Sequence, residues 1–293
     1  MTPARVEVTR PDKLLWPALG MTKQTYVDYL SALSQHMLPW LRDRPLSLIR
    51  APDGVDGHRY FQKNTPSYAP RWIKTVTIPA PSAGRDVAYT VCNDPDTLAW
   101  LGNQAALEFH PAPVRRDNLD RPDLFVVDID PPDDAFAAAV EVAHLVLEIL
   151  DDLGLETLLK TTGGKGLHVV APIVRHVSAE RLRHAATRLA EIATERRPDL
   201  VTAEFRKAKR GGRVMLDPSR NGPGATLVAP YSPRIRPDGT VSFPVLPKDL
   251  RKVKPGDFTL ATVPKLLKGA APKRWREAAD APHQRLPAWL LQE

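Results

Sequence analysis

The clearest chemistry in this sequence lies where an apolar run ends in two carboxylates. Residues 123–132 read Asp-Leu-Phe-Val-Val-Asp-Ile-Asp-Pro-Pro, so Asp128 and Asp130 close a buried strand. Side chains at positions i and i+2 of a strand point to the same face. Two like charges held so close repel unless a cation lies between them, and the spacing therefore predicts a Mg²⁺ or Mn²⁺ site. The alternative is a strand stopped by turn-forming aspartate and proline.

A glycine-rich loop at residues 160–168 reads Lys-Thr-Thr-Gly-Gly-Lys-Gly-Leu-His and lies between two expected strands. Its glycines allow close backbone approach to a ligand, Lys165 adds a positive charge, and Thr162 adds a hydroxyl beside Gly163. This composition predicts a phosphate cradle, although it is not a Walker A loop. An ordinary turn with a solvated lysine is the alternative. His168 begins the next strand and should emerge near the loop.

A third carboxylate, Asp217, ends the short apolar strand 213–217. With the first two aspartates it could hold two divalent ions roughly 3.5–4 Å apart, the arrangement used for in-line displacement at phosphorus. Cations are concentrated around it, which suggests a triphosphate or a nucleic-acid backbone as ligand. They are Arg206, Lys207, Lys209, Arg210, Arg213 and Arg220.

Aromatic side chains alternate with cations in the segment 59–63, Arg-Tyr-Phe-Gln-Lys. Aromatic faces beside Lys63 suit base stacking along a phosphate backbone, whereas such a pair in a strand often belongs to the core. In a strand Tyr60 and Phe61 face opposite ways, so one ring can stack outward while the other packs inward. His110 is expected at the end of a helix, where a surface or core role is the ordinary interpretation.

The elements that must position these residues are mixed. Caps and apolar periodicity predict helices over about 22–41, 94–109, 134–153 and 178–197, the third ended by Gly154. Strands are expected at 74–79 and 86–92 as a hairpin, and at 156–160, 167–173, 213–217 and 225–229. From about Pro233 onward prolines are frequent, and a surface tail with one or two short helices is expected. We expect an α/β fold with mixed sheets in one domain, 1–293. It would have an N-terminal lobe over about 1–110, a catalytic lobe over about 111–260 and a tail over about 261–293.

Composition narrows the class of protein. The chain has 293 residues, 43% hydrophobic content, a net charge of +7 and one cysteine, Cys92. No stretch approaches the roughly 18 apolar residues of a membrane span, and the N-terminus lacks the apolar core of a signal peptide, so a cytoplasmic protein without membrane partners is expected. The positive charge suggests a polyanionic partner.

Several motifs together carry a family resemblance. They are residues 12–17 with 22–23, 60–63, 105–110, 128–131, 162–168, 212–217 and 229–234, in that order along the chain. These motifs closely resemble the polymerase domain of bacterial ligase D, a branch of the archaeo-eukaryotic primase superfamily that serves non-homologous end joining and gap filling. The resemblance implies a primase-polymerase fold with two lobes around a central active-site cleft.

The resemblance also implies roles for individual residues. Asp128, Asp130 and Asp217 would be catalytic and bind two Mn²⁺ or Mg²⁺ ions. The incoming NTP or dNTP would be contacted by Thr162, Gly163, Lys165, His168 and Arg234, with His110 and Arg210 at the same site. DNA contacts would come from Lys13 and Lys23, at the 5′-phosphate across a gap, and from Tyr60, Phe61 and Lys63.

We therefore expect a DNA-dependent nucleotidyltransferase that extends a primer 3′-OH at gaps or broken ends in DNA repair. Partners would be gapped or broken DNA and nucleoside triphosphates, with Ku and a separate or fused ATP-dependent DNA ligase as candidates, and the location would be the nucleoid. The alternatives are a haloacid-dehalogenase-type phosphatase and a non-catalytic nucleic-acid-binding module. The phosphatase pattern needs threonine or valine where this chain has Pro132.

Overall fold

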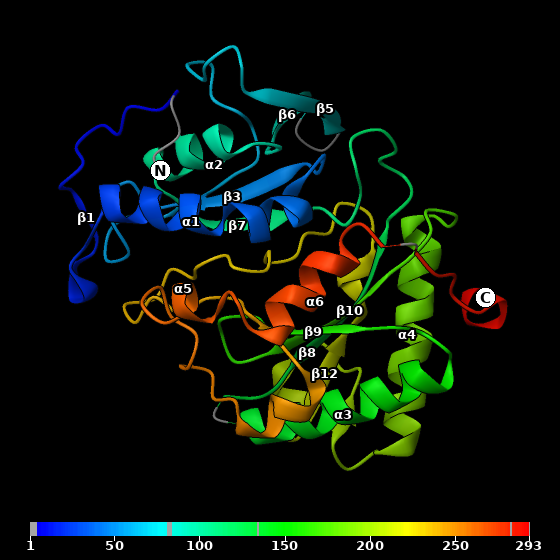
Figure 1. The fold of residues 1–293 in the computed structure, drawn as a ribbon. Helices are drawn as coiled ribbons and strands as arrows, with labels where there is room; N and C mark the ends of the chain where they lie inside the picture. The colour runs from blue at the N-terminus through cyan, green and yellow to red at the C-terminus, as the bar shows by residue number, and fades with distance from the viewer. Residues whose placement is uncertain (1–4, 81–83, 134, 282, 293) are drawn as a thin grey trace. The chain divides into compact units, whose positions relative to one another are not determined.

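A computed structural model of the chain describes residues 5–80, 84–133, 135–281 and 283–292 (Figure 1). The chain forms two compact units, each built from separate segments. Unit 1 contains Met1–Asp117, Thr226–Ser242 and Phe258–Lys268, and unit 2 contains Asn118–Ala225, Phe243–Asp257 and Gly269–Glu293. Helices and several sheets occur together, so the expected mixed α/β class is confirmed.

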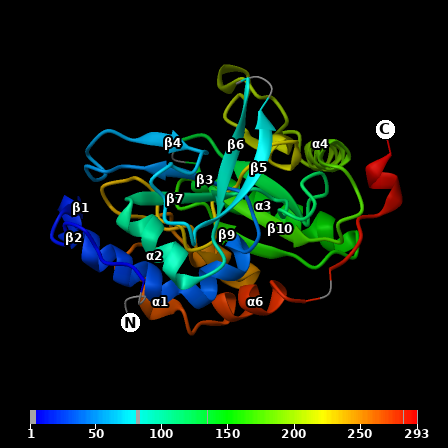
Figure 2. The ribbon, with the colours of Figure 1, turned by 90° about the horizontal axis from the view of Figure 1, so that it is seen from above.

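Unit 1 is a five-stranded sheet with one long helix, two shorter helices and a separate two-stranded sheet. Its elements are β1 (Leu14–Trp16), β2 (Met21–Thr22), α1 (Lys23–Leu41), β3 (Leu46–Arg50), β4 (Tyr60–Gln62), β5 (Lys74–Ala80), β6 (Arg85–Val91), α2 (Pro95–Asn103), β7 (Ala106–Pro111) and α5 (Val263–Leu266), with a 3₁₀ turn at Pro17–Leu19. The sheet has the order β4-β3-β6-β5, and β7 also pairs with β3. Strands β5 and β6 form the expected hairpin, which is seen side-on in Figure 2.

Helix α1 begins as the sequence predicts. The Thr22 hydroxyl accepts a hydrogen bond from the Thr25 amide, which satisfies one of the free amides of the first turn and is worth about 1 kcal/mol. The stripe Tyr26, Leu30 and Met37 is fully buried. Helix α2 packs against α1 at Gly102, where an added Cβ would lie 2.7 Å from a methyl group of Leu30.

The second predicted helix ends earlier than expected, and this is a correction. Asp94 caps α2 as predicted, but Ala105 has a positive φ of 53° that ends the helical path. Residues 106–111 then form β7, paired antiparallel with β3, with Leu107 and Phe109 buried at strand spacing. His110 therefore lies on a strand and not at a helix end.

The strand expected at 225–229 is also absent from the described structure. The segment runs beside β7, and only two of its amides bond to that strand. Leu227 donates to the Pro111 carbonyl and Ala229 to the Phe109 carbonyl. The apolar residues 227–229 are buried without forming a regular ladder.

Unit 2 is a six-stranded sheet that contacts two long helices. Its elements are β8 (Leu124–Asp130), α3 (Phe136–Asp152), β9 (Leu158–Thr161), β10 (Leu167–Pro172), α4 (Ala179–Arg196), β11 (Val201–Thr202), β12 (Val214–Asp217), β13 (Pro244–Val245) and α6 (Ala270–Ala278). Short 3₁₀ turns occur at Lys207–Lys209, Pro218–Asn221, Pro247–Lys252 and Ala288–Leu291. The sheet order is β11-β12-β8-β10-β9-β13, which places β8 between β12 and β10.

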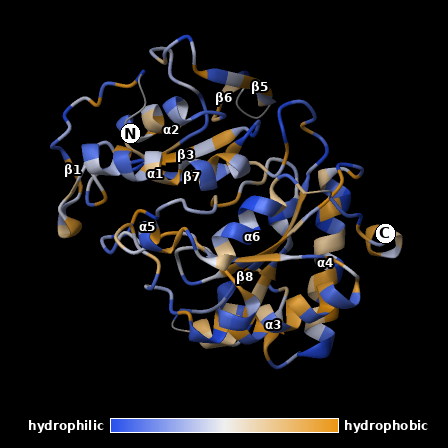
Figure 3. Cartoon of the chain, viewed as in Figure 1, coloured by the Kyte–Doolittle hydropathy of each residue, from blue (hydrophilic) through white to orange (hydrophobic). Residues whose placement is uncertain are grey.

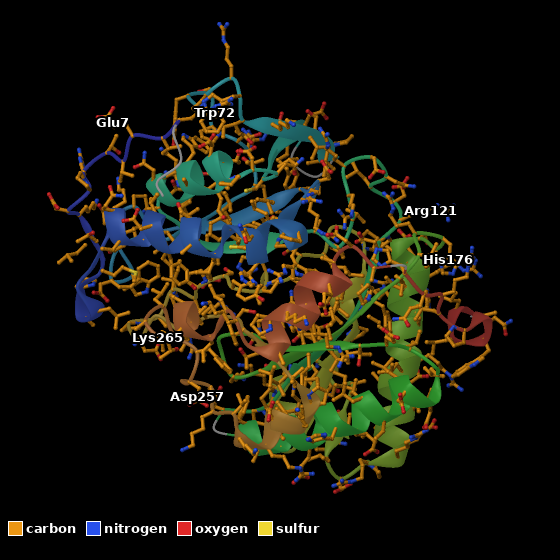
Figure 4. All side chains as sticks on the ribbon, viewed as in Figure 1. Glu7, Trp72, Arg121, His176, Asp257 and Lys265 are labelled. Carbon is orange, nitrogen blue, oxygen red and sulfur yellow. The ribbon has the colours of Figure 1, made fainter. Side chains whose placement is uncertain are left out.

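The apolar residues of unit 2 gather on β8 and along α3, coloured orange in Figure 3. Two hydrogen bonds hold the chain at the start of β8, far from Asp128 and Asp130. The Ile173 amide donates to the Asp123 carbonyl. The Arg121 guanidinium donates to the carbonyl of His176, and these two residues are labelled in Figure 4. Twelve paired residues, six on each strand, define the register of β8 on β10. The two hydrogen bonds beyond the pairing support it. Among the described residues, no helix is both long enough and apolar enough to cross a membrane.

Candidate active site

Four polar side chains form one row across the sheet of unit 2. Strand pairing places Asp128 opposite His168 on β10 and opposite Asp217 on β12. His168 in turn lies opposite Lys160 on β9. Directly opposed residues of antiparallel strands carry their side chains on the same face. Asp130, two residues beyond Asp128, shares that face, so the three predicted aspartates lie on one side of the sheet.

The guanidinium of Arg220 bridges two of these carboxylates. Its Nε donates to Asp128 Oδ2 at 2.8 Å and lies 3.8 Å from Asp217 Oδ2. Burial alone would raise the pKa of Asp128, but the hydrogen bonds and charges of His168 and Arg220 outweigh it and hold that pKa well below its ordinary value. Asp128 is therefore ionised at neutral pH, although it is only 8% exposed.

Two other cations hold Asp130. Arg210 Nη1 donates to Asp130 Oδ2 at 2.9 Å, and Lys165 Nζ lies 3.5 Å from Asp130 Oδ1. Lys165 also contacts the exposed Asp133 at 3.2 Å. Lys165 of the glycine-rich loop thus lies beside Asp130, one of the three predicted aspartates. A lysine in this position is also suited to neutralise phosphate oxygens.

The donor set suits a hard divalent cation, although its carboxylates are occupied by protein cations. Among the described residues, no group of three or more His, Cys, Asp and Glu side chains is arranged to hold a metal ion. The carboxylates of Asp128 and Asp217 nevertheless share one positive group, Arg220. Two oxygen donors that converge on a single cation are the ligands that Mg²⁺ and Mn²⁺ prefer. The residues present therefore fit the metal predicted from the sequence.

The glycine-rich loop is closed by its own threonine. The Thr162 hydroxyl donates to the Gly166 carbonyl at 3.0 Å and accepts from the amides of Gly164 and Gly166 at 3.3 Å. Gly163 has a positive φ of 69°. Gly166 lies so close to β8 that an added Cβ would come within 2.5 Å of the Ile129 carbonyl oxygen. Glycine is thus required for the loop to lie against the strand that carries the aspartates.

His168 is buried beside Asp128, with Nε2 3.4 Å from Asp128 Oδ1. Burial and the charge of Lys160 lower the pKa of His168 to about 4, so its imidazole is neutral at neutral pH. Its Nδ1 is buried without a hydrogen-bond partner in the described part of the chain. The ring therefore keeps one nitrogen available for a ligand.

The two other predicted nucleotide contacts, His110 and Arg234, meet in unit 1. Glu108 lies between them on β7. Its Oε2 is 2.9 Å from His110 Nε2 and 3.2 Å from Arg234 Nε, and its Oε1 accepts from the Ile235 amide. Burial would raise the pKa of Glu108, but these hydrogen bonds and the charge of Arg234 lower it to about 2. Glu108 thus positions both residues.

A cationic pocket of about 380 Å³ contains the two lysines predicted to bind a 5′-phosphate. Its lining includes Arg10, Lys13, Lys23 and Arg50. Lys23 is 6% exposed and donates to the Thr9 carbonyl, and its pKa is lowered by burial and by the charges of Lys13 and Arg10. Several cations held together in one pocket suit an anionic ligand.

The aromatic pair Tyr60 and Phe61 is exposed on both sides of β4, at 38% and 52%. The expectation that one ring packs inward is therefore wrong, because β4 has only three residues and pairs with β3 alone. The Arg50 guanidinium carbon lies 5.5 Å from the centre of the Tyr60 ring, and Lys63 Nζ lies 5.8 Å from that of Phe61. The contact of Lys63 with Phe61 was expected from the sequence, whereas that of Arg50 with Tyr60 was not.

Three residues that neighbour the predicted site residues were not themselves predicted to have a role. Arg220 was grouped only with the cluster of cations, and Glu108 was named only as part of a motif. Lys160, 1% exposed, was read as the end of a strand. A sequence signal existed for Arg220, which follows Asp217 by three residues, the reach of one turn. Lys160 is placed by strand register, which the sequence does not reveal.

Comparison with known proteins agrees with this geometry. Residues 22–275 match the family described as LigD, primase-polymerase domain. The multifunctional non-homologous end joining protein LigD of Mycolicibacterium smegmatis is 37% identical over 82% of this chain and 32% of its own length. The bifunctional LigD of Bacillus subtilis is 32% identical over 88% of this chain and 42% of its own length. The chain therefore spans about a third to two fifths of these relatives.

A solved structure is similar over nearly the whole chain. It is the polymerase domain from Mycobacterium tuberculosis ligase D in complex with DNA, with a TM-score of 0.88 and 33% sequence identity. The match covers 96% of this chain and 100% of that one. A row of aspartates beside a cationic glycine loop and a match of this extent lead to one conclusion. The chain belongs to the LigD primase-polymerase domain family of metal-dependent, nucleotide-polymerising enzymes.

Proposed function

We propose that this chain fills short gaps at DNA breaks, adding NTP or dNTP to a primer 3′-OH in non-homologous end joining. The single observation that carries the proposal is the convergence of Asp128 and Asp217 on one cation, next to the loop that bears Lys165. Ionised carboxylates provide the metal ligands, and the loop provides cationic contacts for a triphosphate.

In the proposed mechanism Asp128, Asp130 and Asp217 would hold two divalent ions, Mn²⁺ or Mg²⁺. These ions would activate the 3′-OH and stabilise the α-phosphoryl group as pyrophosphate leaves. Lys165 leaves its carboxylate partners and binds phosphate oxygens. His168, neutral at neutral pH, contributes a hydrogen bond through its unpartnered Nδ1. The loop from Thr162 to Gly166 holds Lys165 in position by its internal hydrogen bonds.

The DNA contacts of unit 1 would determine which DNA substrate the protein binds. The pocket around Lys13 and Lys23 binds the 5′-phosphate on the far side of a gap, and Tyr60 and Phe61 stack on bases. Arg50 belongs to both, because it lines the pocket and lies over the Tyr60 ring. His110 and Arg234, held by Glu108, contact the incoming nucleotide.

Partners follow from the proposed pathway. DNA ends are the substrate, Ku and an ATP-dependent DNA ligase are the expected protein partners, and the nucleoid is the expected location. Relatives named as bifunctional or multifunctional proteins are longer than this chain. The ligase could therefore act from the same polypeptide or from a separate one.

Primer extension on gapped DNA tests the proposal. Wild-type protein, Asp128→Asn and Asp217→Asn are compared with NTP and dNTP, with Mg²⁺ and Mn²⁺, and with or without the 5′-phosphate. Both variants should lose extension by about 100-fold or more and retain DNA binding, because the carboxylates hold metal and the cationic surfaces hold DNA. Asp199→Asn, at an exposed surface pair with Arg197, is the matched control. Near wild-type extension by Asp128→Asn would refute the metal assignment.

A further inference from the structure

The side chain of Phe205 is unusually exposed for a phenylalanine. It is 72% exposed, more than Tyr68 at 61% or Phe61 at 52%, and more than any other large hydrophobic side chain in the described residues. It belongs to the segment between β11 and β12 in unit 2. Nothing in the proposed mechanism so far uses it.

The side chain of Arg210 connects the backbone at Phe205 to Asp130. Arg210 is 6% exposed, and its guanidinium donates to the Glu204 and Phe205 carbonyls, both at 3.1 Å. The same guanidinium donates to Asp130 at 2.9 Å. The Phe205 backbone is therefore held one guanidinium away from a proposed metal ligand.

The neighbours of the ring decide what kind of ligand it suits. Arg206, Lys207 and Lys209 follow it and are exposed, and the one acidic neighbour, Glu204, accepts a hydrogen bond from the Arg206 amide. A protein-binding patch needs contiguous apolar surface, which these charged neighbours do not provide. An exposed aromatic face beside exposed cations is instead the pattern that binds a nucleobase and its phosphates.

Strand order indicates whether the base that would stack on Phe205 belongs to the primer or to the incoming nucleotide. The glycine-rich loop that would hold the triphosphate precedes β10, on one side of β8. Phe205 precedes β12, on the other side of β8. In-line displacement requires the 3′-OH to attack the phosphorus from the side opposite to the departing pyrophosphate. The primer end therefore belongs on the β12 side.

We propose that Phe205 is a stacking platform for the 3′-terminal base of the primer, with Arg206 and Lys207 receiving the adjacent phosphates. The inference rests on the proposed function, because that function places the primer 3′-OH at the three aspartates. Phe205 is a positioning residue in this scheme. It orients the base whose ribose carries the attacking hydroxyl.

Fluorescence of 2-aminopurine tests the stacking directly, without metal or nucleotide. The fluorescent base is placed at the primer 3′ end, and wild-type protein, Phe205→Leu and Phe205→Tyr are titrated in EDTA. Stacking quenches the signal, so wild-type protein and Phe205→Tyr should quench it. Phe205→Leu keeps the apolar bulk but lacks a π-face, and it should lose the quenching and weaken primer binding by about 5-fold to 100-fold.

The controls separate stacking from charge. Arg206→Gln should weaken binding and flatten its salt dependence while the saturated complex stays quenched. A 2-aminopurine placed within the duplex, away from the 3′ end, should respond equally to wild-type protein and Phe205→Leu. Because the ring is exposed, thermal melting should be the same for all Phe205 variants.

Equal quenching by wild-type protein and Phe205→Leu would overturn the proposal. So would a Phe205→Leu defect confined to the nucleotide saturation curve, which would assign the ring to the incoming nucleotide. Primer extension is measured separately with the wild-type protein. Its absence would refute the proposed polymerase substrate, whereas the quenching pattern decides the stacking site.

Discussion

Asp217 lies directly opposite Asp128 on the neighbouring antiparallel strand, and Arg220 bridges the two carboxylates. Two buried or half-buried anions in adjacent positions would repel each other strongly without that cation. In the proposed mechanism Arg220 thus occupies the electrostatic position that a divalent ion would take. Metal binding would then compete with Arg220 for the two carboxylates.

Arg220→Gln should lower the free energy of unfolding by about 1–2 kcal/mol, because it leaves two adjacent carboxylates without their cation and the arginine is partly exposed. Mn²⁺ should raise the melting temperature of the variant more than that of wild-type protein. Calorimetry with and without Mn²⁺ measures both effects. Arg188→Gln, at an exposed pair with Glu191, is the control and should show neither. Equal metal stabilisation of variant and wild-type protein would contradict the competition.

Asp133→Asn should lower the nucleotide concentration needed for half-maximal extension by about 2-fold to 5-fold, the range of an exposed ion pair. Asp133 holds Lys165 at 3.2 Å and so competes with phosphate for it. Saturation curves in NTP measure the effect, and Lys165→Ala should move them in the opposite direction. Asp152→Asn, which breaks a comparable exposed pair with Arg196, should leave the curves unchanged. An unchanged curve for Asp133→Asn would mean that the pair does not restrain the lysine.

Glu108 should make stability depend on acidity below pH 4.5. Its pKa is lowered from 4.5 to about 2 in the folded state, so between these values the unfolded chain binds more protons than the folded one. The stabilisation, about 3 kcal/mol, is present above pH 4.5 and is lost as the pH falls toward 2. Urea unfolding at pH 7, 4.5 and 3 should show this loss in wild-type protein and a smaller one in Glu108→Gln. Glu191→Gln should behave like wild-type protein, and an equal slope in the Glu108 variant would refute the assignment.

Lys13→Ala/Lys23→Ala should abolish the preference for gapped DNA that carries a 5′-phosphate. The pocket collects several cations, and removing two of them removes the ion contacts that distinguish the phosphate. Binding titrations with phosphorylated and unphosphorylated gaps, repeated at rising salt, measure the preference. Lys265→Ala/Lys273→Ala removes two exposed lysines elsewhere and should keep the preference. Equal discrimination by the pocket variant and wild-type protein would place the phosphate site elsewhere.

Local signals in the sequence predicted the elements that have strong caps or apolar runs. Thr22 and Asp94 cap helices as expected, and the run before Asp128 forms a central strand. These features depend on neighbours within one turn or one strand, so a single sequence reveals them. The site residues on such elements could be named in advance.

Features that depend on pairing between distant segments could not be predicted. Residues 106–111 have a helix-compatible composition, yet pairing with β3 makes them a strand after the positive φ of Ala105. Lys160 joins the aspartate row only because β9 pairs with β10 in one particular register. Register is set by the packed sheet and not by local propensity.

The interleaved connectivity of the two units limits how the enzyme can be cut into parts. The chain passes from one unit to the other at residues 117/118, 225/226, 242/243, 257/258 and 268/269. A fragment covering 118–225 would retain all three aspartates but would lack β13, the outer neighbour of β9. Strand β9 would then become an open edge, ready to pair with another copy. Dissection by truncation is thus expected to give aggregation in place of a minimal catalytic core, and function is better mapped by point substitutions in the intact chain.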